Sequence, residues 1–147
     1  MVFVPGGFSG GDEPDGSGKF ITAFFRNAAI KEQITDLLDN RDGLMLGICN
    51  GFQALVKLGL VPYGKIMDSD CDMPTLTYNV IGRHQSRVVR TRVASNMSPW
   101  LRSVNVGDVF NVPISHGEGR FFASSVPWAS QSWRILSSHI QQLSAKE

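Results

Sequence analysis

A cysteine between two glycines is the strongest chemical signal in this sequence. Cys49 lies in the stretch 47–53, Gly-Ile-Cys-Asn-Gly-Phe-Gln, directly after an apolar run. A nucleophile on a sharp strand-to-helix turn is held in a strained conformation with its side chain exposed, and glycines leave room around it. A helix that begins there favours the thiolate, which is the form that attacks a carbonyl carbon. A buried structural cysteine is the alternative, but the combined features favour a nucleophile.

The second cysteine, Cys71, has none of these features. It lies among Asp68, Asp70 and Asp72, whose negative charges oppose a thiolate, and we interpret it as a bystander. Two cysteines are too few for a disulfide framework, so we expect a reduced, cytoplasmic protein.

A glycine-rich loop is the second candidate for chemistry. Residues 5–11 read Pro-Gly-Gly-Phe-Ser-Gly-Gly and follow the short apolar run 2–4. The end of a parallel strand is where ligand crevices of α/β sheets lie, and successive backbone N–H groups there can bind an oxyanion. The loop matches neither the phosphate-binding loop nor the dinucleotide fingerprint.

The elements around these motifs predict an α/β fold. Apolar spacing predicts an amphipathic helix over 20–38, and the run 44–48 is typical of a central parallel strand that leads into a helix over 50–58. The resulting order predicts a parallel sheet covered by helices. Further along, the pattern predicts strands over 76–81, 86–93 and 109–115, and a short helix near 138–145.

Composition excludes several classes of protein. A chain of 147 residues with 42% hydrophobic and 18% charged residues is typical of one globular domain. The net charge of +1 gives no general attraction to nucleic acid or to an anionic membrane. No apolar run approaches the roughly 18 residues that a membrane span needs. We therefore expect neither nucleic acid nor a membrane as a partner.

Three motifs together resemble the class I (triad) glutamine amidotransferases, and among them the glutaminase domain of phosphoribosylformylglycinamidine synthase. They are the loop 5–12, the elbow 47–53 and the block 113–121, Pro-Ile-Ser-His-Gly-Glu-Gly-Arg-Phe; the stretches 10–25 and 82–87 resemble the long, fused form of that enzyme. The resemblance implies a three-layer, flavodoxin-like sandwich with a mostly parallel sheet. We expect it to be incomplete here, truncated at both ends, with an added β-rich segment after residue 65. The partial amidotransferase domain would cover 1–122, and 123–147 would be a divergent or foreign tail.

The resemblance also assigns roles to residues. Cys49 would attack the side-chain amide of glutamine, form a γ-glutamyl thioester and release ammonia. Gly7, Phe8 and the backbone N–H of Asn50 would lie beside the oxyanion. The expected glutamine-binding residues are Gln53, Ser115, Gly117 and Glu118.

The family's ammonia is used by a separate synthetase domain, which this chain does not contain. That domain converts formylglycinamide ribonucleotide to the amidine with ATP, in purine biosynthesis. The resemblance therefore implies glutamine and the synthetase domain as partners, with no cofactor or metal in the present domain. ATP and magnesium would be needed only by the synthetase.

The sequence departs from the family in two respects. The family has a strand–helix–strand portion ahead of the glycine loop, and it takes its base and orienting carboxylate from a late His-x-Glu motif, which is missing after Phe122. His116 and Glu118 have that spacing, so His116 is a candidate base, although the family uses this block to bind glutamine. His139, followed by Gln141, is better explained as a surface histidine. We therefore expect weak hydrolysis by this chain alone.

Two rival functions remain open from the sequence. The chain could be a catalytically inactive fragment that acts only as a folded or oligomeric binding body. It could also be another cysteine enzyme, such as a small peptidase or deglycase of a related sandwich fold, although those are not expected to combine Gln53 with the block 113–121. We expect Phe20, Phe24, Phe25 and Ile34 to be core residues, and self-association if this core is left exposed.

Overall fold

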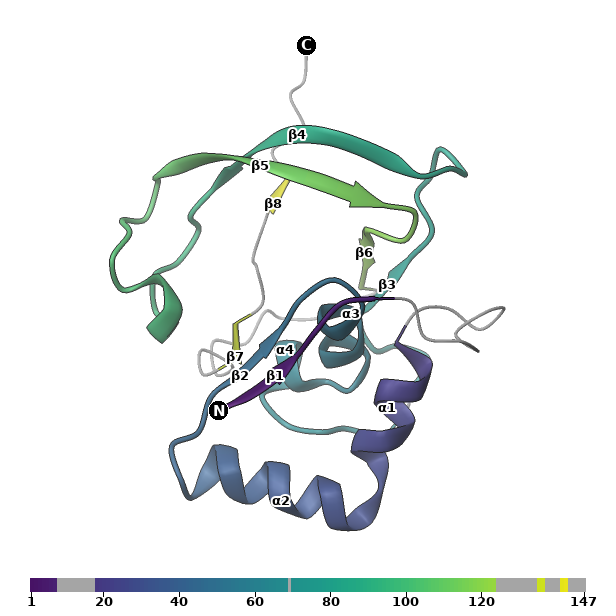
Figure 1. The fold of residues 1–147 in the computed structure, drawn as a ribbon, viewed down its shortest axis with the longest axis vertical. Coiled ribbons are helices and arrows are strands. Elements are labelled where there is room, and N and C mark those ends of the chain that lie inside the picture. Colours follow the sequence, from purple (N-terminus) through teal and green to yellow (C-terminus); the bar gives the residue numbers. More distant parts are fainter. Residues whose placement is uncertain (8–17, 69, 124–134, 137–140, 143–147) are drawn as a thin grey trace.

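The computed structural model describes residues 1–7, 18–68, 70–123, 135–136 and 141–142. A parallel sheet lies at its centre, in the order β1-β2-β7, formed by β1 (Val2–Val4), β2 (Met45–Gly47) and β7 (Ile135–Leu136). Among the strands that the structure describes, β1 lies at one edge of this sheet (Figure 1). The parallel pairing of β1 and β2 confirms the predicted α/β class.

Two helices, rather than the single predicted one over 20–38, connect β1 to β2. They are α1 (Lys19–Arg26) and α2 (Ala28–Asp39), and Asn27 separates them with a non-helical φ of −55° and ψ of 132°. The Asn27 side chain accepts a hydrogen bond from the N–H of Ala29 at 3.1 Å, as an N-terminal cap does. A capping residue inside a continuous apolar pattern therefore divides the helix.

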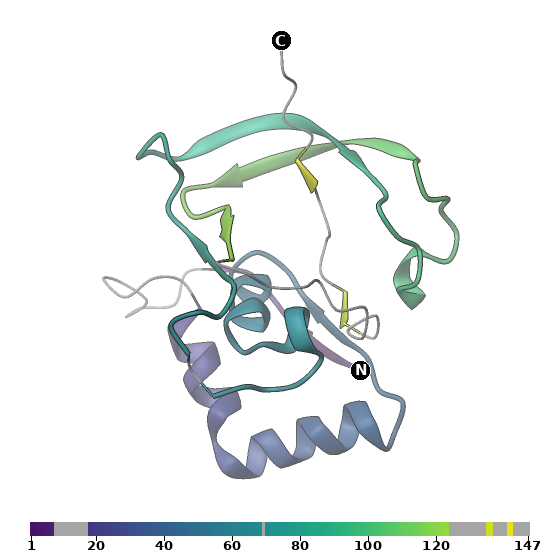
Figure 2. The same cartoon turned by 180° about the vertical axis from the view of Figure 1, so that it is seen from behind.

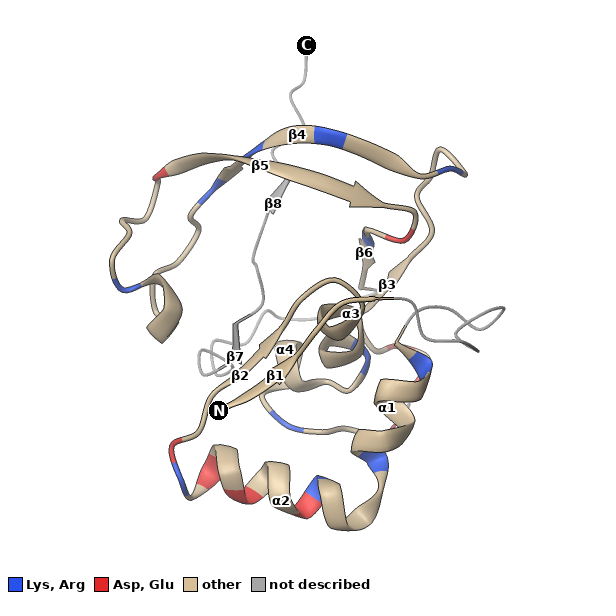
Figure 3. Ribbon diagram, viewed as in Figure 1, with Lys and Arg blue, Asp and Glu red and all other residues tan. Residues whose placement is uncertain are grey.

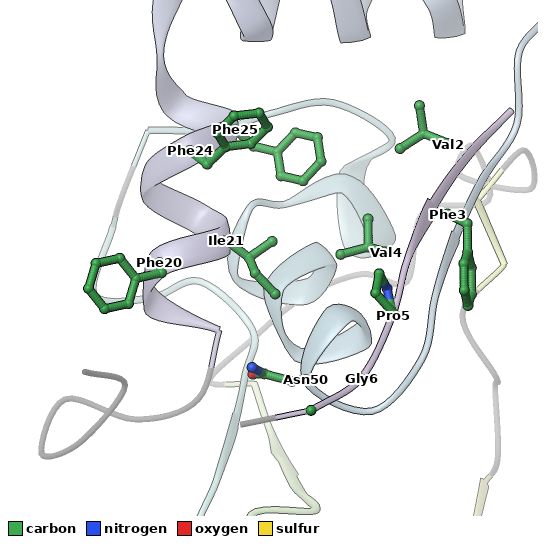
Figure 4. A pocket seen from close by; sticks show the side chains of 11 residues that line it. Val2, Phe3, Val4, Pro5, Gly6, Phe20, Ile21, Phe24, Phe25 and Asn50 are labelled. Carbon is green, nitrogen blue, oxygen red and sulfur yellow. The ribbon is translucent and has the colours of Figure 1, made fainter. Parts of the chain in front are cut away.

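The hydrophobic core lies between the parallel sheet and the helices that precede and follow β2. Helix α3 (Asn50–Lys57) ends close to Gly59, near the predicted stop. Gly59 adopts a left-handed φ of 86° and precedes the short helix α4 (Leu60–Tyr63), which was not predicted. Met45, Leu55 and Leu58 are fully buried. On β1, Val2 and Val4 face α1, whereas Phe3 points to the other side of the sheet and is 50% exposed (Figure 4). The three-layer arrangement therefore stays a prediction.

A second, β-rich part follows α4, as expected after residue 65. A long antiparallel pair, β4 (Gln85–Arg92) and β5 (Val109–His116), arches over one end of the parallel sheet (Figures 1 and 2). The strand predicted over 76–81 is shorter, β3 (Thr75–Thr77), and pairs with an unpredicted strand, β6 (Arg120–Phe122). A single 3₁₀ turn covers Pro99–Leu101.

The predicted helix near 138–145 is wrong where it can be compared. Strand β8 (Gln141–Gln142) lies within it and pairs with β4, and the rest of that segment, like the loop 8–17, is outside the described residues. None of the described helices has the length and apolar character of a membrane span.

Candidate active site

The elbow at Cys49 has the strained geometry that the sequence predicts. Strand β2 ends at Gly47, α3 begins at Asn50, and Cys49 between them has a φ of 54° and a ψ of −117°. Positive φ is rare in residues other than glycine and marks local strain, which is concentrated at functional sites. The thiol is exposed. The backbone around it is fixed by hydrogen bonds from Gly51 N–H to the Ile48 carbonyl (2.9 Å) and from Gln53 N–H to the Cys49 carbonyl (3.0 Å).

Each glycine around the elbow has a neighbour where a side chain would stand. A Cβ on Gly51 would collide with the carbonyl oxygen of Val4 in β1, and a Cβ on Gly47 would lie 2.6 Å from Leu55 Cδ1. The Ile48 N–H also donates to the Val4 carbonyl at 3.1 Å. Strand β1 and the elbow are therefore in direct backbone contact.

The start of the glycine loop lies beside the nucleophile. A Cβ on Gly6 would lie 2.7 Å from Cys49 Cβ and 3.4 Å from its sulfur, whereas Gly7 (φ 123°) has open space around it. Sequence reasoning selected Gly7 and Phe8 but missed Gly6. Phe8 lies outside the described residues. The predicted proximity of loop and cysteine is thus present at Gly6.

Gln53 lies beside the turn after β5 that contains Glu118. The side-chain Nε2 of Gln53 donates to the backbone carbonyl of Glu118 at 2.9 Å, across 65 residues of sequence. Ser115, on β5, has its hydroxyl 2.8 Å from Nε2 of His84. Gln53 stands one helical turn after Cys49, so the block is brought to the helix that carries the nucleophile.

Asn79 is a buried polar residue that sequence reasoning missed. Its backbone N–H donates to the Gly117 carbonyl (2.8 Å), and its side chain joins the turn at 116–119 through hydrogen bonds with His116 and Gly119. A signal was present in the sequence, because Asn79 and Gly82 are the first and last residues of a β-turn, closed by a 2.9 Å hydrogen bond. The same turn explains why β3 ends before residue 78.

His116 has its partner in Asn79. Its Nδ1 lies 3.0 Å from Asn79 Oδ1, and among the described residues no hydrogen bond is seen between its ring and Cys49. Burial lowers the pKa of His116 from its usual 6.5, and the charge of His84 lowers the pKa further. These contacts favour a supporting role for His116 over that of the base.

The lowered pKa of His116 predicts a pH dependence of stability. The folded ring binds its proton more weakly than the unfolded ring, so its contribution to stability is complete above the unfolded pKa of 6.5 and is lost as the pH falls through the lower folded value. We expect urea unfolding to show a smaller loss of stability between pH 7.5 and 5.5 for His116→Gln than for the wild type. His84→Gln should keep most of the loss, because burial is the larger cause; equal losses in all three would contradict the prediction.

Cys71 is placed as expected for a bystander. It is exposed, and the pKa of its thiol is raised, first by its hydrogen bond to Asp70 (Sγ to Oδ1, 3.4 Å) and then by the charges of Asp72 and Asp70. These three residues lie close enough together to hold a metal ion, but they are exposed and remote from the elbow in sequence. An exposed acidic group of this kind is not by itself a site.

An apolar groove of about 600 Å³ runs between α1 and β1 (Figure 4). Phe20 and Phe24 line it and are 55% and 59% exposed, so their prediction as core residues is wrong, whereas Phe25 and Ile34 are buried. Strand β1 carries no charged residue (Figure 3). The residues expected to be core thus divide between a buried part and an open groove.

Comparison with known proteins gives consistent similarities. Residues 1–134 match the family described as CobB/CobQ-like glutamine amidotransferase domain. The chain is 33% identical over 135 residues to "Phosphoribosylformylglycinamidine synthase subunit PurQ" of Synechococcus elongatus, covering 88% of this chain and 51% of the relative. It is 35% identical over 127 residues to the protein of the same name from Nostoc, covering 84% and 47%.

A solved structure is also similar. The structure of PurLQS from Thermotoga maritima contains a chain that superposes with a TM-score of 0.62 at 28% identity, over 84% of this chain and 51% of that one.

The present chain spans about half the length of the curated relatives it matches. Those relatives carry the name of a subunit, so the finer resemblance to the long, fused form stays a prediction, as does a domain boundary at residue 122.

Proposed function

The chain belongs to the CobB/CobQ-like glutamine amidotransferase family, and from this premise we propose that it is a glutaminase part of phosphoribosylformylglycinamidine synthase. It would release ammonia from glutamine for the ATP-dependent amidation of formylglycinamide ribonucleotide in purine biosynthesis. The observation that carries the proposal is the exposed, strained Cys49 with Gly6 at its side chain and Gln53 one helical turn away.

The proposed reaction begins with attack of the Cys49 thiolate on the side-chain amide carbon of glutamine. A carbon–sulfur bond forms and the carbonyl electrons move to oxygen; when they return, the carbon–nitrogen bond breaks, and the nitrogen leaves as ammonia after taking a proton. Water then hydrolyses the γ-glutamyl thioester to glutamate and restores the thiol. Gly7, Phe8 and the backbone N–H of Asn50 are the proposed oxyanion-binding groups. The contact between Gly6 and Cys49 supports this assignment.

The proposed glutamine pocket uses Gln53, Ser115, Gly117 and Glu118. The hydrogen bond between Gln53 and the Glu118 carbonyl supports it, because it joins the helix of the nucleophile to the turn after β5. His116 remains a candidate base, but its contact with Asn79 argues against that role. We therefore expect hydrolysis by this chain alone to be impaired. The proposed reaction needs no cofactor or metal in this domain, and ATP and magnesium would act only in the synthetase.

The synthetase is the proposed partner of this chain. Self-association through the open groove between α1 and β1 stays a second prediction. The groove is apolar, β1 is an edge strand on this side, and edge strands pair readily with further strands. The net charge of +1 gives little repulsion between copies. A second copy of the chain is a proposed occupant of this edge, and light scattering at several protein concentrations measures whether it binds.

The decisive experiment uses 6-diazo-5-oxo-L-norleucine, a glutamine analogue that alkylates cysteine nucleophiles. We expect a single adduct, on Cys49, when peptides are read by mass spectrometry. Glutamine should slow the formation of this adduct, whereas larger homologues of glutamate should not. Cys71 is the internal control, because it is also exposed but has a raised pKa. Absence of an adduct in folded protein would favour the alternative, an inactive fragment that acts only as a binding body.

A further inference from the structure

The buried side chain of Asn79 has a role beyond the residues assigned so far. We propose that Asn79 is a positioning residue of the glutamine site, which holds the turn at 116–119 where the Glu118 backbone meets Gln53. This inference rests on the proposed function and deepens it, because it names what fixes one wall of the pocket. Asn79 acts through the turn and is not itself assigned a contact with glutamine.

The hydrogen bonds of Asn79 use every polar group of its side chain. Nδ2 donates to the carbonyl of His116 at 2.8 Å and to that of Arg83 at 3.0 Å. Oδ1 accepts from the N–H of Gly119 at 3.3 Å. The residue is only 9% exposed, and burial makes each of these bonds costly to lose.

These partners permit only one orientation of the amide. Carbonyl oxygens can only accept and a backbone N–H can only donate, so Nδ2 must face His116 and Arg83 while Oδ1 faces Gly119. His116 Nδ1 lies 3.0 Å from Oδ1 and must therefore carry the hydrogen when the ring is neutral. Asn79 thus fixes both the backbone of the turn and the tautomer of its histidine.

The turn connects Asn79 to the nucleophile helix. On one side, Asn79 binds the backbone of His116, Gly117 and Gly119. On the other side, the Glu118 carbonyl accepts from Gln53 on α3, whose first turn follows Cys49. Loss of the Asn79 side chain should therefore move the wall of the pocket while the thiol stays in place.

Inactivation of the full chain by 6-diazo-5-oxo-L-norleucine separates these two effects. For Asn79→Ser we expect the analogue concentration at half-maximal rate to rise about tenfold, because the turn that carries Glu118 loses the side chain that holds it. The maximal rate, and the rate of Cys49 alkylation by iodoacetamide, should stay within about twofold. Asn96→Ser is the matched control, because Asn96 is exposed and makes only a 3.4 Å bond to the Val104 carbonyl.

A double-mutant cycle with Gln53→Leu tests the connection itself. If Asn79 acts through Glu118 and Gln53, the two substitutions together should weaken analogue binding less than the product of their separate effects. Independent effects, or equal loss of analogue and iodoacetamide reactivity, would overturn the inference. If the wild type itself shows no glutamine-protected adduct, the proposed function fails; if the wild type is labelled and Asn79→Ser is unchanged, only this inference fails.

Hydrogen exchange on the wild type gives a test that needs no variant to fold. Glutamine should slow amide exchange in peptides that cover both 76–82 and 113–121. Protection of 113–121 with no change in 76–82 would show that Asn79 does not share in the binding event, and would overturn the inference.

Discussion

Cys49→Gly should abolish labelling by the glutamine analogue and, at the same time, make the fold more stable. The loss of labelling follows from removal of the sulfur and should exceed about a thousandfold, as for the removal of other enzyme nucleophiles. The gain in stability follows from the φ of 54° at this position. Strain of this kind costs on the order of 1–3 kcal/mol, and glycine relieves it at an entropic cost of about 0.5–1 kcal/mol. We expect a net gain of about 1 kcal/mol in urea unfolding.

Cys49→Ala is the matched variant, because it removes the sulfur but keeps the Cβ and hence the strain. It should be as unreactive as the glycine variant, with a free energy of unfolding within about 0.5 kcal/mol of the wild type. Equal stability of the alanine and glycine variants would show that the elbow stores no strain. Labelling that survives in either variant would place the reactive group elsewhere.

Gly51→Ala is the second substitution with a large expected effect, and it acts on stability. A Cβ at this position meets the carbonyl oxygen of Val4, with the Pro5 carbonyl oxygen at 2.8 Å. Backbone cannot move aside as a flexible side chain can, and overpacking typically costs about 1–3 kcal/mol. The better helix propensity of alanine returns at most about 1 kcal/mol. We expect a net loss of about 1–2 kcal/mol in urea or thermal unfolding.

Gly117→Ala is the control for this prediction. Gly117 has open space where a Cβ would stand, and its φ is not in the left-handed region. Its substitution should change the free energy of unfolding by less than about 0.5 kcal/mol. If Gly51→Ala and Gly117→Ala were equally stable, the close packing of α3 on β1 would be contradicted.

The elbow at Cys49 and the end of the helix after it could be predicted, because both depend on residues that are neighbours in the sequence. The apolar run before Cys49, the flanking glycines and the helix after it are sufficient to indicate an elbow, and the structure has that geometry. The helix stop at Gly59 was predicted for the same reason. The break at Asn27 was missed because the apolar spacing continues across it, although a capping side chain ends the hydrogen-bonded pattern there.

Contacts distant in sequence were beyond this kind of reasoning. Strand β6 is three residues long and is defined by its pairing with β3, in which Leu76 lies opposite Phe121, 45 residues later in the chain. Asn79 resembles an ordinary turn residue until its partners at 116–119 are known. Gly6 could not be separated from Gly7, because only the structure shows which of them touches Cys49.

The contact between β1 and the elbow has a thermodynamic consequence. Val4 lies between the outer edge of the sheet and the nucleophile, since its carbonyl accepts from Ile48 and packs against Gly51. A molecule that shifted β1 on binding would therefore also shift the backbone beside Cys49. Linkage is reciprocal, so occupation of the cysteine must change the affinity of that edge by the same factor. A ligand that moved β1 would act on the cysteine through the peptide carbonyl of Val4.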